Sequence, residues 1–234
     1  MLRRIVVILF IACALTVRAG DHVFESGPQK TRLIELFTSQ GCSSCPPAET
    51  WLSKLKSEPG LWKEFVPIAF HVDYWDRLGW RDPFAAKEWT ARQYQYSANW
   101  KSESVYTPGF VLDGHEWMGR SIPTAATEKP GVLKLSVKDQ KIAAEFVPTG
   151  NGPKDFDLHV AQLGFDLTTK VGAGENSGRN LKQDFIVLSL SNGKVSAGKT
   201  DFAFNPDSRA SGIAAWITLP SRIEPIQAVG GWLR

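Results

Sequence analysis

The sequence predicts an α/β fold in the first half of the chain and an antiparallel, β-rich second half, so that the whole is α+β. Three observations carry this prediction. An apolar segment, a Cys-Ser-Ser-Cys motif and a helical pattern follow one another within residues 31–56. Apolar runs at residues 66–72 and 109–112 are typical of strands in a buried sheet. Beyond residue 130, short strand-like segments alternate with turn residues.

The Cys-Ser-Ser-Cys motif lies where a predicted strand, residues 32–38, meets the first turn of a helix. The helix is indicated by apolar residues that recur on one face, namely Ala48, Trp51, Leu52 and Leu55. Free backbone N–H groups and the helix dipole at this position lower the pKa of the Cys42 thiol. Cys45 is near enough to close a disulfide with Cys42. A strand, C-x-x-C and a helix together are typical of a thioredoxin-like redox motif.

Residues 31 to about 120 resemble a thioredoxin-like domain. The segments ELFTSQGCSSCPPAE, HVDYWDRLGW, VYTPGFVLDG and GAGENSGRNL together resemble a secreted bacterial family known as domain of unknown function family 1223. This resemblance implies a thioredoxin-like fold and no particular substrate. In relatives a histidine typically follows the last segment, whereas this chain has Gln183 near that place.

The resemblance also implies roles for three further residues. Thr107 and Pro108 would form the Thr-Pro pair, with a cis bond, that faces the cysteines and pairs with a substrate peptide. Glu35 would be a buried acid that moves the proton of the second cysteine. The alternative for Glu35 is a carboxylate that reaches solvent or pairs with Arg or Lys, because burial without a partner is unfavourable. His71, at the end of the strand at 66–72, either approaches the cysteines or has a structural role.

Further elements follow from local signals. Asp82 and Pro83 predict the N-cap and first residue of a helix to about residue 100. Residues 73–80 follow a strand and could line a substrate groove. Residues 172–181 lack the lysine of a phosphate loop; their Glu175, Asn176 and Arg179 either hold a turn or reach the redox site. Residues 132–137, 141–147, 157–163, 185–190 and 213–219 predict a sandwich-like half, either a distinct domain or an elaboration of the first.

The N-terminus predicts export. Arg3 and Arg4 precede an apolar run, residues 5–15, and Ala19 offers a signal-peptidase site. The alternative, a membrane anchor, needs about 20 apolar residues. We therefore expect a signal peptide at 1–19, a thioredoxin-like domain at 20–128 and a β-rich unit at 129–234, in a periplasmic or secreted protein. Three arginines of the signal account for the formal charge of +3, so the mature chain has no electrostatic footprint for nucleic acid or membrane.

These observations favour an exported thiol–disulfide oxidoreductase that acts on protein or small-molecule thiols and disulfides. Its predicted site residues are Cys42, Cys45, Thr107, Pro108 and Glu35. It needs no cofactor beyond the redox-active disulfide, and no metal; the oligomeric state is not predicted. One alternative is a copper- or zinc-binding, metallochaperone-like protein. The other is a non-catalytic binding module whose disulfide is a structural staple.

Overall fold

The computed structural model describes residues 21–119 and 121–233, so the predicted signal peptide lies outside the described residues. Over this part of the chain the fold is mixed α/β, with mostly antiparallel sheets. Its α-helices are α1 (Pro46–Lys54) and α2 (Lys87–Asn99), accompanied by 3-10 turns at Leu55–Ser57 and Asp76–Leu78. None of the helices within these ranges is long and apolar enough to cross a membrane.

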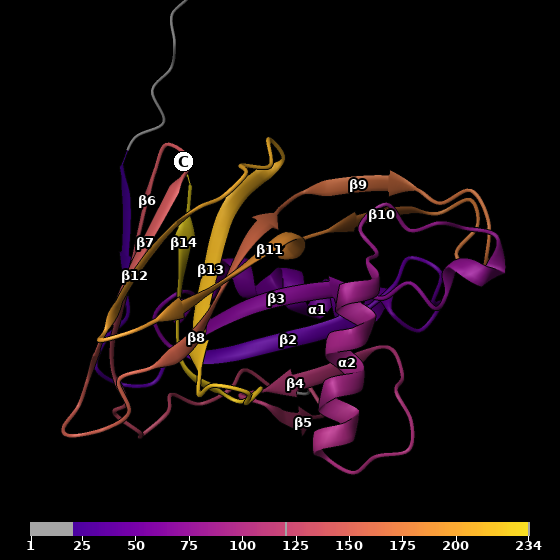
Figure 1. The fold of residues 1–234 in the computed structure, drawn as a ribbon. Coiled ribbons are helices and arrows are strands. Elements are labelled where there is room, and N and C mark those ends of the chain that lie inside the picture. Colours follow the sequence, from indigo (N-terminus) through magenta and orange to yellow (C-terminus); the bar gives the residue numbers. More distant parts are fainter. Residues whose placement is uncertain (1–20, 120, 234) are drawn as a thin grey trace, which may run out of the picture.

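An eight-stranded sheet forms the centre of the molecule, in the order β14-β13-β8-β11-β3-β2-β4-β5 (Figure 1). From the first half come β2 (Arg32–Thr38), β3 (Phe65–His71), β4 (Gly109–Leu112) and β5 (His115–Trp117); from the second come β8 (Phe156–Gly164), β11 (Ile186–Val195), β13 (Ala210–Thr218) and β14 (Pro225–Trp232). The pairs β2–β3 and β3–β11 are parallel, and the others are antiparallel. Because Ala69 of β3 pairs with Ile186 of β11, one sheet contains strands from both halves. The division into two domains stays a prediction.

A four-stranded sheet packs on the second half of the large one. It consists of β1 (His22–Glu25), β6 (Gly131–Lys138), β7 (Lys141–Pro148) and β12 (Lys199–Ala203). Buried and exposed residues alternate along β6, as expected for a strand with one face on a core. That core joins side chains of both sheets, among them Leu133, Leu135, Ile142, Phe146, Leu158, Ile213 and Ile217. The second half is therefore a sandwich, with an additional ribbon of β9 (Leu167–Lys170) and β10 (Asn180–Gln183).

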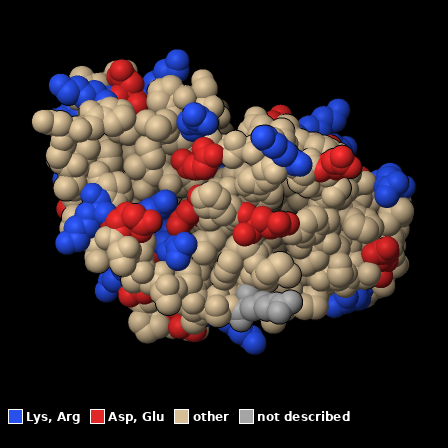
Figure 2. All heavy atoms as spheres, turned by 90° about the horizontal axis from the view of Figure 1, so that it is seen from below, with Lys and Arg blue, Asp and Glu red and all other residues tan. Residues whose placement is uncertain are grey.

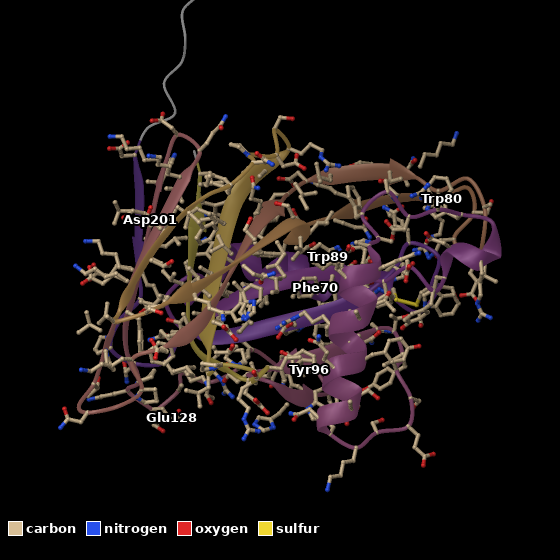
Figure 3. All side chains as sticks on the ribbon, viewed as in Figure 1. Phe70, Trp80, Trp89, Tyr96, Glu128 and Asp201 are labelled. Atoms are coloured by element: carbon tan, nitrogen blue, oxygen red, sulfur yellow. A yellow bond between two sulfur atoms is a disulfide. The ribbon has the colours of Figure 1, made fainter. Side chains whose placement is uncertain are left out.

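The two helices cover opposite faces of β2. Alternation along the strand puts Phe37 on the face of α2, where its ring contacts Tyr96 with centroids 6.1 Å apart. Thr38 points the other way and donates a hydrogen bond to Glu49 of α1 at 2.7 Å. Phe70 of β3 packs on Trp89 of α2, and Figure 3 shows Phe70, Trp89 and Tyr96 together at this interface. Because both faces of β3 are covered by other elements, all of its residues are buried, which explains why its sequence is almost entirely apolar.

Local signals located the elements around the cysteines but not every boundary. The strands at 32–38 and 109–112 are confirmed, as is a helix that begins at Pro46. The prediction of Asp82 as a helix N-cap is wrong, because α2 begins at Lys87 and is preceded by Ala86. Asp82 instead accepts a hydrogen bond from the Gln40 backbone N–H and pairs with a histidine. Its other oxygen accepts the backbone N–H of Phe84, so the carboxylate supports the loop before α2 rather than the first turn of the helix.

Candidate functional site

A disulfide joins Cys42 and Cys45, whose Cα atoms lie 5.5 Å apart, at the start of α1. Cys45 is the N-cap residue, and prolines occupy the first helical positions, where no N–H is needed for an intrahelical bond. Both cysteines are fully buried. The Cys42 Sγ lies 3.3 Å from the hydroxyl oxygen of Ser44. The redox-capable bond is thus held at a helix N-terminus but is covered in this conformation.

Thr107 and Pro108 lie directly beside this disulfide. Their peptide bond is cis, and it precedes β4. The carbonyl oxygen of Thr107 is 3.8 Å from the Cys42 Sγ. The indole N–H of Trp75 donates to the Thr107 hydroxyl at 2.8 Å. A Cβ atom on Gly41 would lie 2.9 Å from the Trp75 Cβ, so only glycine fits there. The structure therefore brings four predicted site residues together, with Trp75 spanning the two segments that flank Cys42.

Glu35 is engaged elsewhere. It shares the α2 face of β2 with Phe37, whereas the helix that carries Cys45 is on the opposite face. Its carboxylate accepts a hydrogen bond from Arg92 Nε at 2.6 Å and another from the Tyr96 hydroxyl. The Arg92 guanidinium in turn lies over the rings of Phe70, Tyr96 and Trp216. This arrangement departs from the expected role of Glu35 beside the cysteines and matches the alternative, a carboxylate paired with Arg.

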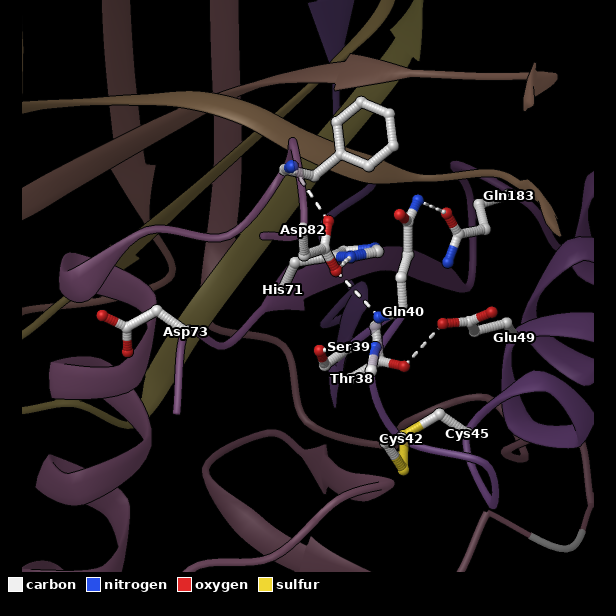
Figure 4. A network of polar contacts seen from close by, with 12 residues as sticks. Thr38, Ser39, Gln40, Cys42, Cys45, Glu49, His71, Asp73, Asp82 and Gln183 are labelled. Atoms are coloured by element: carbon white, nitrogen blue, oxygen red, sulfur yellow. Dashed lines mark hydrogen bonds and ion pairs between the residues drawn. A yellow bond between two sulfur atoms is a disulfide. The ribbon is translucent and has the colours of Figure 1, made fainter. Parts of the chain in front are cut away.

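A different set of polar side chains is buried on the α1 face, next to the cysteines (Figure 4). We call it the buried polar cluster; its members are Thr38, Gln40, Glu49, His71, Asp82 and Gln183, all at most 5% exposed. His71 Nδ1 and Asp82 Oδ2 are 2.7 Å apart. The side-chain amide of Gln40 donates to Gln183 Oε1 at 2.8 Å. Because β2 and β3 are parallel and Thr38 pairs with His71, both side chains share the face on which Glu49 lies.

Burial and mutual attraction shift the protonation of this cluster. Burial raises the pKa of Glu49, since a charged carboxylate is poorly solvated there. Burial alone would lower the pKa of His71, but the charge and hydrogen bond of Asp82 outweigh it and raise that pKa. Burial would raise the pKa of Asp82, yet His71 outweighs it and lowers that pKa. Glu49 therefore retains its proton to higher pH than an exposed glutamate, and the attraction between His71 and Asp82 favours the charged form of each.

The glycine-rich segment at 172–181, which joins β9 to β10, reaches the cysteine loop. A carboxylate oxygen of Glu175 accepts a hydrogen bond from the Ser43 backbone N–H at 2.9 Å. Asn176, fully buried, donates to the carbonyl of Cys42 at 2.8 Å. Arg179 donates to the Asn176 side chain at 2.6 Å. The segment therefore does both things expected of it: it forms backbone turns, and through Glu175 and Asn176 it contacts the cysteine loop.

Sequence reasoning missed Glu49, Gln40 and Asp82. One signal could have found Glu49, because it follows Cys45 by one helical turn and so lies on the same face of α1. Gln40 and Asp82 have no comparable local signal. Within residues 21–119 and 121–233, no three His, Cys, Asp or Glu side chains are grouped so as to hold a metal ion.

The chain is similar to solved structures from two organisms. An Agrobacterium tumefaciens protein, solved by the Northeast Structural Genomics Consortium, is 24% identical with a TM-score of 0.65, over 86% of this chain and 94% of that one. HBP35 of Porphyromonas gingivalis is 13% identical with a TM-score of 0.55, over 87% of this chain and 75% of that one. At such identities the likeness concerns the fold alone. No curated protein matches the chain. The model of a family described as protein of unknown function (DUF1223) matches residues 33–217, so the chain belongs to that family.

Proposed function

We propose that the protein is an exported thiol–disulfide oxidoreductase with a thioredoxin-like core. The single observation that carries this proposal is the set of groups around one disulfide. Cys45 is the N-cap of α1 and Cys42 lies in the loop just before it. The Thr107 carbonyl is 3.8 Å from the Cys42 sulfur, and titratable side chains such as Glu49 are buried on the side of Cys45.

The arrangement of the core supports the thioredoxin-like part of the proposal. The strands β3, β2, β4 and β5 are neighbours in this order, with β2 and β3 parallel and the β4–β5 hairpin antiparallel. The helix after β2 begins with the cysteine motif, and α1 and α2 cover opposite faces. A cis proline stands at the start of β4.

In the proposed reaction the reduced protein reduces a substrate disulfide. The Cys42 thiolate attacks one substrate sulfur, which forms a mixed disulfide and releases the other substrate sulfur as a thiolate that takes up a proton. The Cys45 thiolate then attacks the Cys42 Sγ, which re-forms the Cys42–Cys45 disulfide and releases the second substrate thiol. The protein loses two electrons and the substrate gains two. Run backwards, the same steps oxidise a substrate dithiol.

Glu49 is the proposed proton acceptor for Cys45. A buried thiol is a poor nucleophile until it loses its proton, and Glu49 lies one turn further along α1 with its carboxylate held by Thr38. A carboxyl whose pKa is raised by burial accepts a proton more readily than an ordinary glutamate. Glu49 would thus take the Cys45 proton during resolution and return it when the pair is reduced.

The proposed partners are protein or small-molecule thiols and disulfides. Figure 2 shows one face of the molecule, on which acidic and basic side chains are interspersed. A mixed surface gives no reason to add nucleic acid to these partners. Export would put the protein where disulfides persist.

A second candidate function is a binding module in which the disulfide is only structural. The observation that favours it is the complete burial of both cysteines, since a substrate sulfur must reach Cys42 for exchange to occur. Against it, so small a ring constrains the unfolded chain little and therefore stabilises the fold little.

The test is to trap the mixed disulfide. A Cys45→Ser variant, reduced and then mixed with oxidised glutathione or with insulin, should accumulate an adduct on Cys42 that mass spectrometry locates. The Cys42→Ser variant, as matched control, should form none at Cys45 in the same time. An unmodified Cys42 after hours, together with wild-type protein that fails to accelerate insulin reduction by dithiothreitol, would leave the structural disulfide as the function.

A further inference from the structure

The mechanism above does not use the segment that joins β9 to β10. This segment comes from the second half of the chain, yet Figure 1 shows the β9–β10 ribbon extending to the end of the molecule where the loop after β3 lies. A Cβ on Gly172 would lie 3.0 Å from the ring of Trp80, so glycine lets the segment approach that loop closely. Gly174 has a φ of +75°, a backbone conformation that favours glycine.

Asn176 holds the segment against the cysteine loop through hydrogen bonds to the loop backbone. It is fully buried, and its amide donates to the carbonyl oxygens of Gln40 at 3.0 Å and Cys42 at 2.8 Å. Its own carbonyl oxygen accepts from Arg179. All three hydrogen bonds are made without solvent access to Asn176, so the position of residue 175 beside the loop is defined by buried contacts.

In this position Glu175 accepts a hydrogen bond from the backbone N–H of the residue after Cys42. Its carboxylate accepts the Ser43 N–H, one of the backbone groups that precede α1. That hydrogen bond lowers the pKa of Glu175, so the side chain is charged at neutral pH. Ser43 lies two residues before the N-cap Cys45, and its N–H is taken by the Glu175 carboxylate. This negative charge beside the cysteine loop would repel a second negative charge on the neighbouring Cys42 sulfur.

We propose that Glu175 is a positioning residue that restrains the reactivity of Cys42: its carboxylate, held beside Ser43 by buried Asn176, opposes the Cys42 thiolate and favours the disulfide over the dithiol. The inference deepens the proposed oxidoreductase function and rests on it for its biological meaning. It makes the second half of the chain part of the redox site, as the element that sets how strongly the pair oxidises.

Other charged groups lie on segments packed around the loop, and they bear on Cys42 as well. None of these groups changes in the comparison below, so their effect on the Cys42 thiol is the same in both proteins. They are Glu49, His71, Asp76, Asp82 and Arg179. Glu175 differs from them because its partner is the backbone N–H of the residue next to Cys42.

The experiment compares the full-length chain with its Glu175→Gln variant, which keeps an oxygen acceptor for Ser43 and removes only the charge. Both are fully reduced, and alkylation of Cys42 is followed against pH, peptide by peptide, by mass spectrometry. The variant should have about a twofold to fivefold larger thiolate fraction at neutral pH, the size expected for one exposed charge close to a thiolate. Its dithiol–disulfide equilibrium with glutathione should shift towards the dithiol by a similar factor.

Salt and a second variant separate charge from structure. The difference should shrink as ionic strength rises from about 0.01 to 1 M, because screening weakens exposed charges; a purely structural effect would persist. Glu25→Gln, an exposed glutamate on β1 of the other sheet, should change nothing. Equal Cys42 alkylation profiles for wild type and Glu175→Gln would overturn the inference. That readout does not need turnover, so a chain that fails to exchange with glutathione counts against the proposed function and leaves this comparison decisive.

Discussion

Two buried glutamates on opposite faces of one sheet have different surroundings. Glu35 meets Arg92 and Tyr96 of α2, and the guanidinium is itself enclosed by aromatic rings. Glu49 meets the Thr38 hydroxyl and lies near His71, on the face where α1 carries Cys45. Both side chains are at most 5% exposed, so burial does not distinguish them. The partner does: Glu35 is hydrogen-bonded to a guanidinium, whereas Glu49 is hydrogen-bonded to a neutral hydroxyl and its pKa is raised by burial.

The comparison teaches that strand alternation decides which acid lies on the same side of the sheet as Cys45. A residue on β2 faces α1 or α2 according to its parity, and Glu35 has the parity of Phe37, which contacts α2. An acid on α1 itself, one turn beyond Cys45, avoids this restriction. We therefore assign stability to the Glu35 side and proton transfer to the Glu49 side, and the following predictions test that assignment.

The largest expected effect is on the Glu35 side. Arg92→Leu leaves a carboxylate buried without its cation, which should lower the free energy of unfolding by about 3–5 kcal/mol, measured by urea denaturation. The folded fraction should still exchange disulfides at the wild-type rate. Adding Glu35→Gln to this variant should restore part of the loss. A loss below about 1 kcal/mol would mean that the pair is not the structural element described here.

On the Glu49 side the effect should be kinetic. Glu49→Gln keeps an oxygen for the Thr38 hydroxyl but cannot accept a proton, so resolution of the mixed disulfide should slow about 100-fold at neutral pH. Stability should change by about 1 kcal/mol or less. Stopped-flow release of a glutathione adduct would measure the rate, with Glu35→Gln as the matched control. If Glu49→Gln and Glu35→Gln slowed resolution of the mixed disulfide equally, the assignment of proton transfer to Glu49 would be wrong.

Much of this site could be predicted from the local sequence. The cysteine motif, β2, the start of α1 and the Thr-Pro pair before β4 all have short-range signals. The sequence could not show that Glu35 lies on the side of the sheet away from Cys45, because this depends on which face of β2 packs against which helix. Asp82 satisfied the N-cap pattern but found stronger partners in Gln40 and His71. Short strands such as β5, β9 and β10 are too brief to show a period, so pairing rather than pattern defines them.

The His71–Asp82 pair should make stability depend on pH. The pKa of His71 is raised, so its contribution is complete below about pH 6.5, its unfolded value, and is lost as pH rises through the folded value. The pKa of Asp82 is lowered, so its contribution is present above about pH 3.9 and is lost as pH falls through the folded value. Thermal unfolding from pH 3 to 9 should show a maximum between these limits, on the order of 1–2 kcal/mol above the flanks. Asp82→Asn should flatten the profile; an unchanged curvature would contradict the pairing.

The smallest expected effect concerns access to the disulfide. Trp75→Phe removes the hydrogen bond to Thr107 and should let the segments beside Cys42 separate more often. Reduction by dithiothreitol should become about twofold to fivefold faster, as expected for the loss of one hydrogen bond of about 1 kcal/mol. Tyr94→Phe, at an exposed position of α2, is the control. Identical rates would show that Trp75 does not restrict access.

The most direct test of the central claim is the reduction potential of the Cys42–Cys45 pair, from equilibration in glutathione and dithiothreitol buffers. The account predicts a value between about −120 and −270 mV, the range of catalytic thiol–disulfide exchangers. A value below about −300 mV, typical of structural disulfides, would contradict it. In that case the buried polar cluster beneath Cys45 would have a structural role, and the disulfide would be a staple.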